Sequence, residues 1–192
     1  MFESHGVPLR RLRITTTGRV TKGVGERILS LDANCMARAY QISGTWDIQK
    51  MTPEDLDEVL AIEVSASSTP WSRRMFFEEM QNPRSCCFVI KIEIELKQPV
   101  IGFMCFRNIA EESELLNLAV HPHYRRLGVG RKLMQFYIDF SSQRGVKTFY
   151  LEANSSNERA IRLYQHFSYQ SFGMRKKFYQ KQFDALLMTK KV

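Results

Sequence analysis

The hydrophobic pattern divides the chain at about residue 44. Residues 1–44 are basic and glycine-rich, with neither the 3.6-residue period of a helix nor the alternation of a strand. From Trp46 onward, strand-like and helix-like patterns follow one another to the C-terminus. We therefore expect a flexible basic extension over 1–44 and a folded domain over 45–192.

The pattern beyond Trp46 predicts a mixed α/β domain in the order β-α-α-β-β-β-α-β-α-β-β. Short turns join the three middle strands, so these strands are expected to pair antiparallel. One parallel crossover is expected near the middle of the domain. The expected strands cover 46–51, 86–94, 100–109, 114–120, 147–153, 169–179 and 183–191, and the expected helices cover 53–63, 73–80, 129–140 and 157–167.

Two helix starts carry recognisable local signals. Thr52 is suited to cap the first helix, with Pro53 at its first position. Ser72 is suited to cap the second. Trp71 precedes this cap and is placed to pack on Phe76 as a hydrophobic staple.

Composition narrows the class of protein. At 192 residues and 44% hydrophobic content, the chain is long enough to bury a core as one domain. Its net charge of +8 suits an anionic partner but identifies no chemistry. The four cysteines lack metal-ligand spacing, so we expect reduced thiols and a cytoplasmic protein. No apolar run approaches the roughly 18 residues of a membrane span, so no membrane partner is expected.

Half of the excess charge lies in residues 1–44, where seven Lys and Arg face three Asp and Glu. Three explanations for this segment remain open: a flexible arm, a cleaved organelle-targeting segment, or translation upstream of the real start. Met36 and Met51 are the candidate later starts, although a start at Met51 would delete the first strand. An arm or a mis-set start is favoured over targeting.

The stretch HPHYRRLGVGRKL, residues 121–133, joins an expected strand to an expected helix. Peptide N–H groups at a helix start lack partners and carry partial positive charge, which suits a phosphate. Gly128 and Gly130 allow the backbone to approach a ligand closely. Arg125, Arg126 and Arg131 add charge that can fork onto phosphate oxygens.

Two common phosphate-binding motifs do not fit this stretch. The Walker loop is excluded because GVGRKL lacks the Gly-Lys-Ser/Thr ending, and the dinucleotide fingerprint is disfavoured because its third glycine is missing. A bare G-x-G is more often a plain turn than a binding site. The prediction of a phosphate-binding turn therefore depends on the arginines and on a second motif about 20 residues later, LEANSSNERAIRLYQHF.

With both motifs, the chain resembles the GNAT acyl-CoA N-acyltransferases. Within them it is most similar to the RimI-type branch, which acetylates the N-terminal alanine of a ribosomal protein. The resemblance covers about 46–192 and includes the PWS turn and the closing DALLM. It implies an α/β GNAT fold whose mixed central sheet is splayed at the coenzyme site, with helices on both faces.

Carried over position by position, the resemblance implies acetyl-CoA as cosubstrate and no metal. It implies Glu152 as general base and Tyr164 as general acid. In this interpretation the arginine-glycine turn wraps the coenzyme pyrophosphate, while the end of the preceding strand and Asn157 contact the pantetheine arm. The expected coenzyme site comprises Leu118, Ala119, Val120, Arg125, Arg126, Leu127, Gly128, Val129, Gly130, Arg131 and Asn157.

These roles form a coherent mechanism. An α-amino group has a pKa near 8, so much of it is protonated at neutral pH and cannot attack a thioester. A carboxylate can take that proton, directly or through water. A backbone N–H near Val120 would hold the oxyanion, and a tyrosine hydroxyl can protonate the departing thiolate.

Structural roles compete with the catalytic ones. From composition alone, a strand-end carboxylate such as Glu152 more commonly pairs with a basic neighbour, and packing alone explains a tyrosine on the apolar helix face of Tyr164. Ser155 and Glu158 have the spacing of a capping box. In that case Asn157 belongs only to the start of a helix and need not contact the coenzyme.

Glu114 is the alternative base, because other GNAT branches carry the base at this strand position.

The sequence departs from the family after the helix that bears the tyrosine, where Ser168 and Tyr169 replace glycine and phenylalanine. A non-glycine residue in a left-handed cap costs on the order of 1 kcal/mol, which predicts a reshaped helix end. Near the C-terminus, Phe178 and Phe183 stand in a segment where the family favours tyrosines, a proline and an acidic residue.

The leading hypothesis is transfer of the acetyl group of acetyl-CoA to the α-amino group of a protein, at the N-terminal alanine of a small-subunit ribosomal protein. The alternative is a GNAT enzyme acting on a small amine or a lysine side chain. A third hypothesis, a ribosome- or nucleic-acid-binding module using the basic arm, is disfavoured because the aromatic residues fall at expected core positions. Nucleic acid is therefore expected only through weak ribosome association of the arm.

Overall fold

The computed structural model describes residues 45–94, 97–179 and 183–192. The expected extension, residues 1–44, lies outside the described residues. The helical elements are η1 (Pro53–Asp55), α2 (Leu56–Ala66), α3 (Arg73–Gln81), η2 (Pro122–Tyr124), α4 (Val129–Ser142) and α5 (Glu158–His166). The strands are β1 (Trp46–Lys50), β2 (Ser85–Ile92), β3 (Val100–Ile109), β4 (Glu112–Val120), β5 (Thr148–Asn154), β6 (Gln170–Tyr179) and β7 (Phe183–Lys191). The predicted order of strands and α-helices is confirmed.

The predicted local signals act much as expected. The Ser72 hydroxyl accepts a hydrogen bond from the Met75 N–H, and the Trp71 and Phe76 rings pack with centroids 5.2 Å apart. At the first helix, Pro53 opens a 3₁₀ turn, η1, before α2 begins. The Asp55 carboxylate there accepts hydrogen bonds from the backbone and hydroxyl of Thr52.

The seven strands form one sheet in the order β1-β2-β3-β4-β5-β7-β6. The hairpins β2–β3 and β3–β4 are antiparallel, as their short turns predicted. The pair β4–β5 is parallel and is bridged by α4. Strand β7 inserts between β5 and β6, pairing antiparallel with both. The predicted parallel crossover therefore lies at the centre of the sheet.

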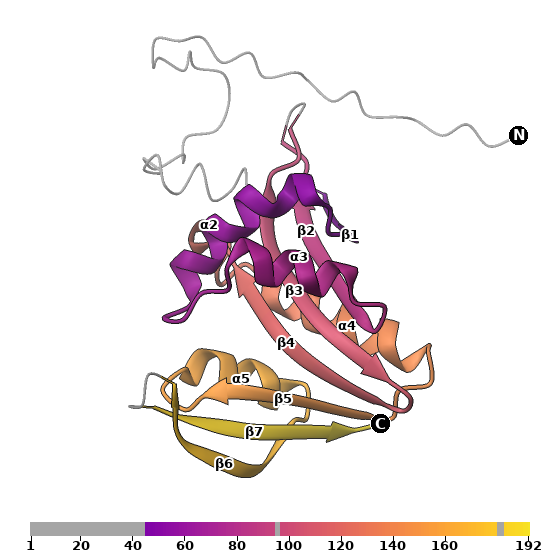
Figure 1. Cartoon of the computed structure of the whole chain (residues 1–192), viewed down its shortest axis with the longest axis vertical. Helices are drawn as coiled ribbons and strands as arrows, with labels where there is room; N and C mark the ends of the chain where they lie inside the picture. The colour runs from indigo at the N-terminus through magenta and orange to yellow at the C-terminus, as the bar shows by residue number, and fades with distance from the viewer. Residues whose placement is uncertain (1–44, 95–96, 180–182) are drawn as a thin grey trace, which may run out of the picture.

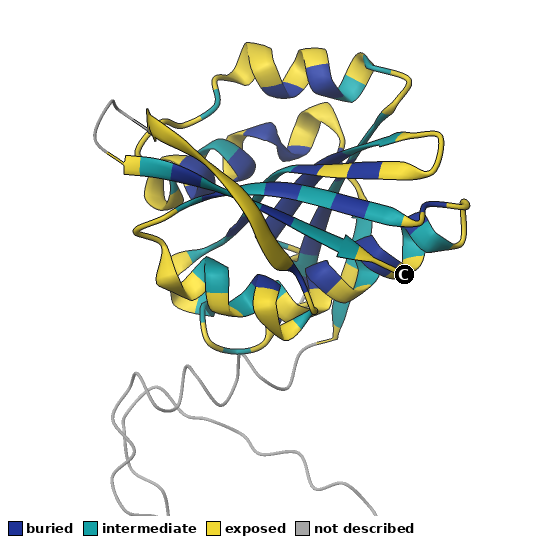
Figure 2. Ribbon diagram, turned by 90° about the horizontal axis from the view of Figure 1, so that it is seen from below, coloured by how far each residue is buried: buried dark blue, intermediate teal, exposed yellow. Residues whose placement is uncertain are grey.

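Helices cover both faces of this sheet (Figures 1 and 2). On one face, α4 and α5 pack on a core that includes Leu115, Leu133 and Phe149. On the other, α2 and α3 pack on a core that includes Val59, Phe76 and Phe103. Successive strand residues point to opposite faces, so the two cores draw on alternate positions of the same strands.

The sheet opens between its two halves. The parallel pairing of β4 and β5 extends only from Glu112 opposite Thr148 to Leu115 opposite Leu151. Beyond that point the two strands diverge (Figure 1). The end of β4 therefore lacks a neighbouring strand on its β5 side, as the expected splayed sheet requires.

Strand β4 also carries an irregularity that the sequence did not predict. Its register against β3 shifts, so that Phe106 lies opposite Leu115 and Cys105 lies opposite Asn117. Leu116 is the extra residue of this β-bulge. The bulge lies at the point where the pairing of β4 with β5 ends.

The helix end after α5 has the left-handed cap that glycine usually forms, but with a serine in that position. Ser168 has a φ of 65°, and the N–H of Tyr169 donates to the carbonyl of Tyr164. The predicted reshaping is therefore wrong, because serine adopts the left-handed conformation that glycine prefers.

Replacing Ser168 by glycine is expected to stabilise the protein by about 1 kcal/mol, because the Cβ strain disappears. This corresponds to a rise in Tm of about 2–4 °C in a thermal melt. Gly145, at φ 87°, gives the matched control, since Gly145→Ser introduces the same strain and should lower the Tm. An unchanged or lower Tm for Ser168→Gly would contradict this explanation.

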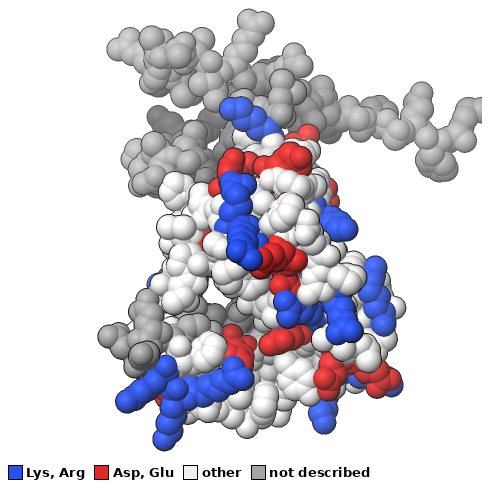
Figure 3. Space-filling model, in the orientation of Figure 1, with Lys and Arg blue, Asp and Glu red and all other residues white. Residues whose placement is uncertain are grey.

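Strand β6, at the edge of the sheet, differs from the expectation that aromatic residues face the core. Residues 170–178 are all exposed (Figure 2). The side chains of Phe172 and Phe178 are 58% and 51% exposed, so the expectation is wrong for this hairpin. The strand also carries Arg175, Lys176 and Lys177 in succession. Basic side chains gather at the turn end of β6 and β7, at the lower left of Figure 3.

Candidate active site

The unpaired edge of β4 is the first part of the site. The N–H of His121 donates to the Ile101 carbonyl on the β3 side. Because peptide groups alternate between the two sides of a strand, those of Leu118 and Val120 face the opening toward β5. Leu118 and the N–H of Val120 thus offer backbone groups to an extended ligand, while the Ala119 side chain is buried against α2 and α3.

The turn before α4 presents backbone N–H groups at the mouth of this opening. Arg126 and Gly128 both have positive φ, 68° and 95°, which curls the chain into the start of α4. A Cβ at Gly128 would meet no atom within 4 Å, so glycine serves the backbone conformation there. A Cβ at Gly130 would lie 3.3 Å from Leu163, so this glycine allows α5 to pack against α4.

The three arginines of the turn have different surroundings. The Arg125 Nε donates to the Val120 carbonyl at 3.0 Å, and its Nη2 donates to the Ser65 carbonyl at 3.3 Å. Arg125 therefore ties the turn to β4 and α2. Arg126 and Arg131 are exposed and form no ion pair with any described residue. These two side chains, with the N–H groups at the start of α4, fit a pyrophosphate.

Replacing Gly128 by valine is expected to weaken acetyl-CoA binding by about tenfold or more, because a β-branched residue rarely adopts this φ and the turn must change shape. Calorimetry gives the Kd. The matched control reverses two charges in the N-terminal segment, Arg11→Glu with Arg13→Glu, and should leave the Kd nearly unchanged. Equal losses from both changes would mean that binding rests on diffuse charge alone.

The candidate base Glu152 lies near the C-terminal end of β5. Its neighbours Leu151 and Ala153 point into the α4–α5 core, so Glu152 faces the same side of the sheet as α2 and α3. Its side chain is 26% exposed, and its Oε1 lies 3.0 Å from Nη1 of Arg175 on β6. The ion pair that competed with the catalytic role therefore exists, while the carboxylate remains accessible.

Glu152 and the alternative base Glu114 line one cavity of about 300 Å³. Glu114 lies opposite Tyr150 in the parallel register, and Glu152 is two residues further along β5. Both carboxylates therefore point to the same face. The rest of the lining is Arg107, Ile109, Glu112, Ser113, Tyr150, Leu151, Phe172, Arg175 and Leu187.

Tyr164 lies on the opposite face of the sheet. It belongs to α5, is 8% exposed and packs within the α4–α5 core. Its ring lies 6.1 Å from that of Tyr169, centroid to centroid. The sheet opening therefore separates a carboxylate on one face from a tyrosine hydroxyl on the other.

Asn157 is the residue that caps α5. Its side-chain oxygen accepts a hydrogen bond from the Ala160 N–H at 3.1 Å. The expected capping box of Ser155 and Glu158 is therefore wrong, because the cap lies two residues later than its spacing suggested. This cap occupies the amide oxygen, and the amide nitrogen remains the group that Asn157 can offer a coenzyme.

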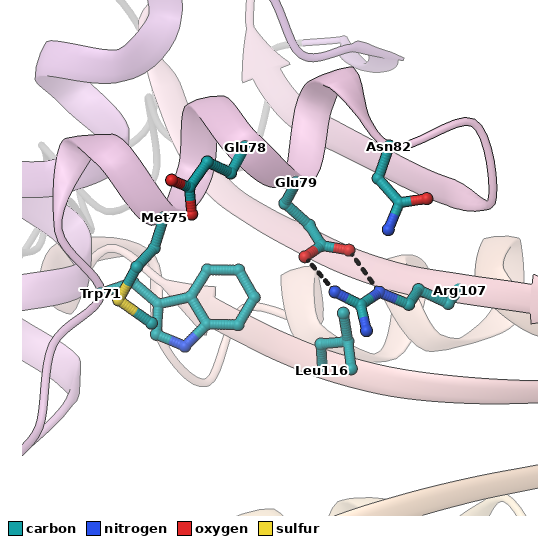
Figure 4. A pocket seen from close by; sticks show the side chains of 7 residues that line it. All are labelled: Trp71, Met75, Glu78, Glu79, Asn82, Arg107 and Leu116. Atoms are coloured by element: carbon teal, nitrogen blue, oxygen red, sulfur yellow. Dashed lines mark hydrogen bonds and ion pairs between the residues drawn. The ribbon is translucent and has the colours of Figure 1, made fainter.

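A second cavity, of about 350 Å³, was not predicted from the sequence (Figure 4). It lies between α3 and strands β3 and β4, and its lining comprises Trp71, Met75, Glu78, Glu79, Asn82, Arg107 and Leu116. The one sequence feature that could have indicated this cavity is Arg107, a charged residue at the end of the apolar run VIGFMCF. Leu116 reaches this cavity from the bulge in β4.

Comparisons with known proteins identify the family and agree with the fold. The family model "Acetyltransferase (GNAT) family" matches residues 56–169. The [ribosomal protein bS18]-alanine N-acetyltransferase of Salmonella typhimurium is 31% identical over 145 residues, covering 74% of this chain and 95% of the relative. The crystal structure of the Escherichia coli ribosomal-protein-S18-alanine N-acetyltransferase superposes with a TM-score of 0.69 at 30% identity, covering 77% of this chain and 94% of the other.

Arabidopsis thaliana NAA60, solved in complex with acetyl-CoA, shares the fold with a TM-score of 0.69 at 20% identity. The match covers 77% of this chain and 99% of that structure. Within the described ranges, no helix is long and apolar enough to cross a membrane.

Proposed function

We propose that this chain, which belongs to the GNAT acetyltransferase family and is an acetyl-CoA-dependent N-acetyltransferase, acetylates the α-amino group of a protein. The acceptor we propose is the N-terminal alanine of a small-subunit ribosomal protein. Two relatives of about 30% identity, which the chain covers almost completely, are named [ribosomal protein bS18]-alanine N-acetyltransferases. The function thus rests on family membership together with the arrangement of the site.

One observation carries the mechanism: the two candidate catalytic groups lie on opposite faces of the splayed sheet. Glu152 opens into a cavity on the α2–α3 face, whereas Tyr164 lies in the α4–α5 face. The phosphate-binding turn opens α4, on the same face as Tyr164. The coenzyme and the acceptor amine would therefore approach the opening from opposite sides. The amine would approach Glu152, and the thioester of the coenzyme would approach Tyr164.

The proposed reaction uses these two side chains in sequence. The Glu152 carboxylate takes a proton from the acceptor ammonium, so that the nitrogen lone pair can attack the acetyl carbonyl carbon. As the new C–N bond forms, the C–S bond breaks and the Tyr164 hydroxyl gives its proton to the departing sulfur. The nitrogen then loses its second proton, which passes through water to the tyrosine oxygen and restores the hydroxyl. Backbone groups at the end of β4 would orient the acyl chain and stabilise the negative charge on its oxygen.

The shape of the acceptor side favours a peptide over a small amine. Two cavities lie on the α2–α3 face and share Arg107 in their linings, so together they extend from α3 to the β6–β7 hairpin. A small amine would need only the part next to Glu152. An elongated surface instead suits the first residues of a polypeptide.

We place the activity in the cytoplasm, where the ribosomal acceptor is made. The cysteines that the structure describes, Cys86, Cys87 and Cys105, are free thiols, which suits a reducing compartment. Residues 1–44 would add at most weak ribosome association through their positive charge. Deleting them should lower ribosome binding and leave acetylation of a free peptide unchanged.

Mass spectrometry of protein N-termini tests the proposed acceptor. Purified small-subunit ribosomal proteins are incubated with the enzyme and acetyl-CoA. We expect a mass increase of one acetyl group on the N-terminal peptide of a protein that begins with alanine. Acetylation confined to lysine side chains would assign the enzyme to another branch of the family.

A further inference from the structure

Arg107 lies where the two cavities of the acceptor face meet. It is the residue common to the linings of both, and it lies opposite Glu114 in the register of β3 and β4. One cavity contains the candidate bases and the other lies under α3. A ligand that extends from one cavity into the other would therefore lie beside Arg107.

The guanidinium is held in a fixed orientation. Its Nε and Nη2 each donate to a carboxylate oxygen of Glu79 at 2.6 Å, which forms a two-pronged ion pair. The Glu79 side chain is only 9% exposed and also accepts a hydrogen bond from Ser85. Burial raises the pKa of Glu79, but the hydrogen bonds from Arg107 and Ser85 outweigh it, so the net pKa is lowered and the carboxylate stays ionised.

One donor of Arg107 remains available. Nη1 makes no hydrogen bond to any residue that the structure describes, and it points away from Glu79 on the side of Leu116 (Figure 4). The Arg107 side chain is 38% exposed, so a ligand can reach this nitrogen. Because the ion pair already fixes the orientation of the guanidinium, little conformational entropy is lost when Nη1 donates to an acceptor atom of a ligand.

The surroundings indicate what that acceptor atom is. Glu78 and Glu79 line the α3 cavity and Glu114 lies beside Arg107, so an anionic ligand would meet three carboxylates. A neutral carbonyl oxygen accepts the same hydrogen bond without that repulsion. The lining also includes the apolar side chains of Trp71, Met75 and Leu116, and Leu116 lies beside the Arg107 guanidinium (Figure 4).

We propose that Arg107 binds a main-chain carbonyl of the acceptor, and that the α3 cavity takes the side chain of the acceptor's second residue. That side chain is apolar, because the cavity offers it Trp71, Met75 and Leu116. Glu79 acts through Arg107 as a positioning residue. The inference rests on the proposed protein acceptor and adds to it a preference at the second position.

The first test compares alanine-headed peptides that differ only at position 2, with leucine, aspartate or lysine there. The wild-type kcat/KM should be highest for leucine and lowest for aspartate. Met75→Ala, which changes only an exposed part of the wall, should reduce the advantage of leucine. Equal kcat/KM for all three peptides would overturn the inference, whereas acetylation of none would instead contradict the proposed function.

The second test removes the donor. Arg107→Met alone would leave Glu79 as an unpaired buried charge and threaten the fold, so it is combined with Glu79→Gln. The double variant should raise the KM for the leucine peptide roughly ten- to hundredfold, the effect of losing a charged hydrogen-bond donor. The KM for acetyl-CoA and the kcat should change little.

The matched control, Glu111→Gln with Lys147→Gln, removes an exposed ion pair away from both cavities and should leave every constant unchanged. A merely structural Arg107 would leave the peptide KM of the folded double variant unchanged. That result would overturn the proposal.

Discussion

Replacing Tyr164 by phenylalanine is expected to reduce kcat by roughly a hundred- to ten-thousand-fold, the range of general acid catalysis. The phenyl ring keeps the packing of Tyr164 within the α4–α5 core, where the residue is 8% exposed. Only the hydroxyl is lost, so no cavity forms and the Tm should change little. Acetyl-CoA should still bind, because the turn before α4 is untouched.

The kcat and the Tm of Tyr164→Phe have to be measured together on an alanine-headed peptide. The neighbouring Tyr169 provides a matched control, since Tyr169→Phe removes a buried hydroxyl from the same tyrosine pair. Its kcat should stay near the wild-type value. A stable Tyr164→Phe variant with wild-type kcat would remove Tyr164 from the mechanism.

Replacing Glu152 by glutamine should also lower kcat by about a hundredfold or more, because an amide cannot take the proton of the incoming ammonium. The KM for acetyl-CoA should barely change, since Glu152 lies on the acceptor face. Raising the pH should partly restore the rate of the variant. The α-amino group has a pKa near 8, so above that pH it arrives already deprotonated.

Glu114→Gln is the matched comparison for this prediction. Glu114 lines the same cavity and carries the same charge, but it lies beside Arg107 and before the opening of the sheet. Its replacement should cost less activity than that of Glu152. The reverse ranking, measured as kcat at pH 7, would assign the base to Glu114.

The sequence predicted the fold well where local patterns and burial agree. Strand alternation defines the strands, the Ser72 cap sets the start of α3, and short turns leave the hairpin strands little choice of partner. The helix at Asn157 shows the limit of such signals. Ser155 with Glu158 and Asn157 with Ala160 are both plausible caps over the same residues, and the geometry of the turn decides between them.

The site was predicted less completely, because much of it depends on contacts between distant segments. The ion pair of Glu152 with Arg175 requires β7 to insert between β5 and β6. The cavity beside Arg107 requires a bulge in β4 and a carboxylate from α3. None of these pairings follows from a local period, whereas the turn before α4 is local in sequence, and its place between a strand and a helix was predicted directly.

The most direct measurement places the acetyl group on a single acceptor that offers both kinds of amine. A peptide with a free N-terminal alanine and an internal lysine is incubated with the enzyme and acetyl-CoA, and fragment masses locate the modification. The proposed function predicts acetylation of the α-amino group and none of the lysine, with a blocked N-terminus abolishing the reaction. Acetyl transfer to the lysine of the blocked peptide, at a rate equal to that on the free peptide, would contradict it.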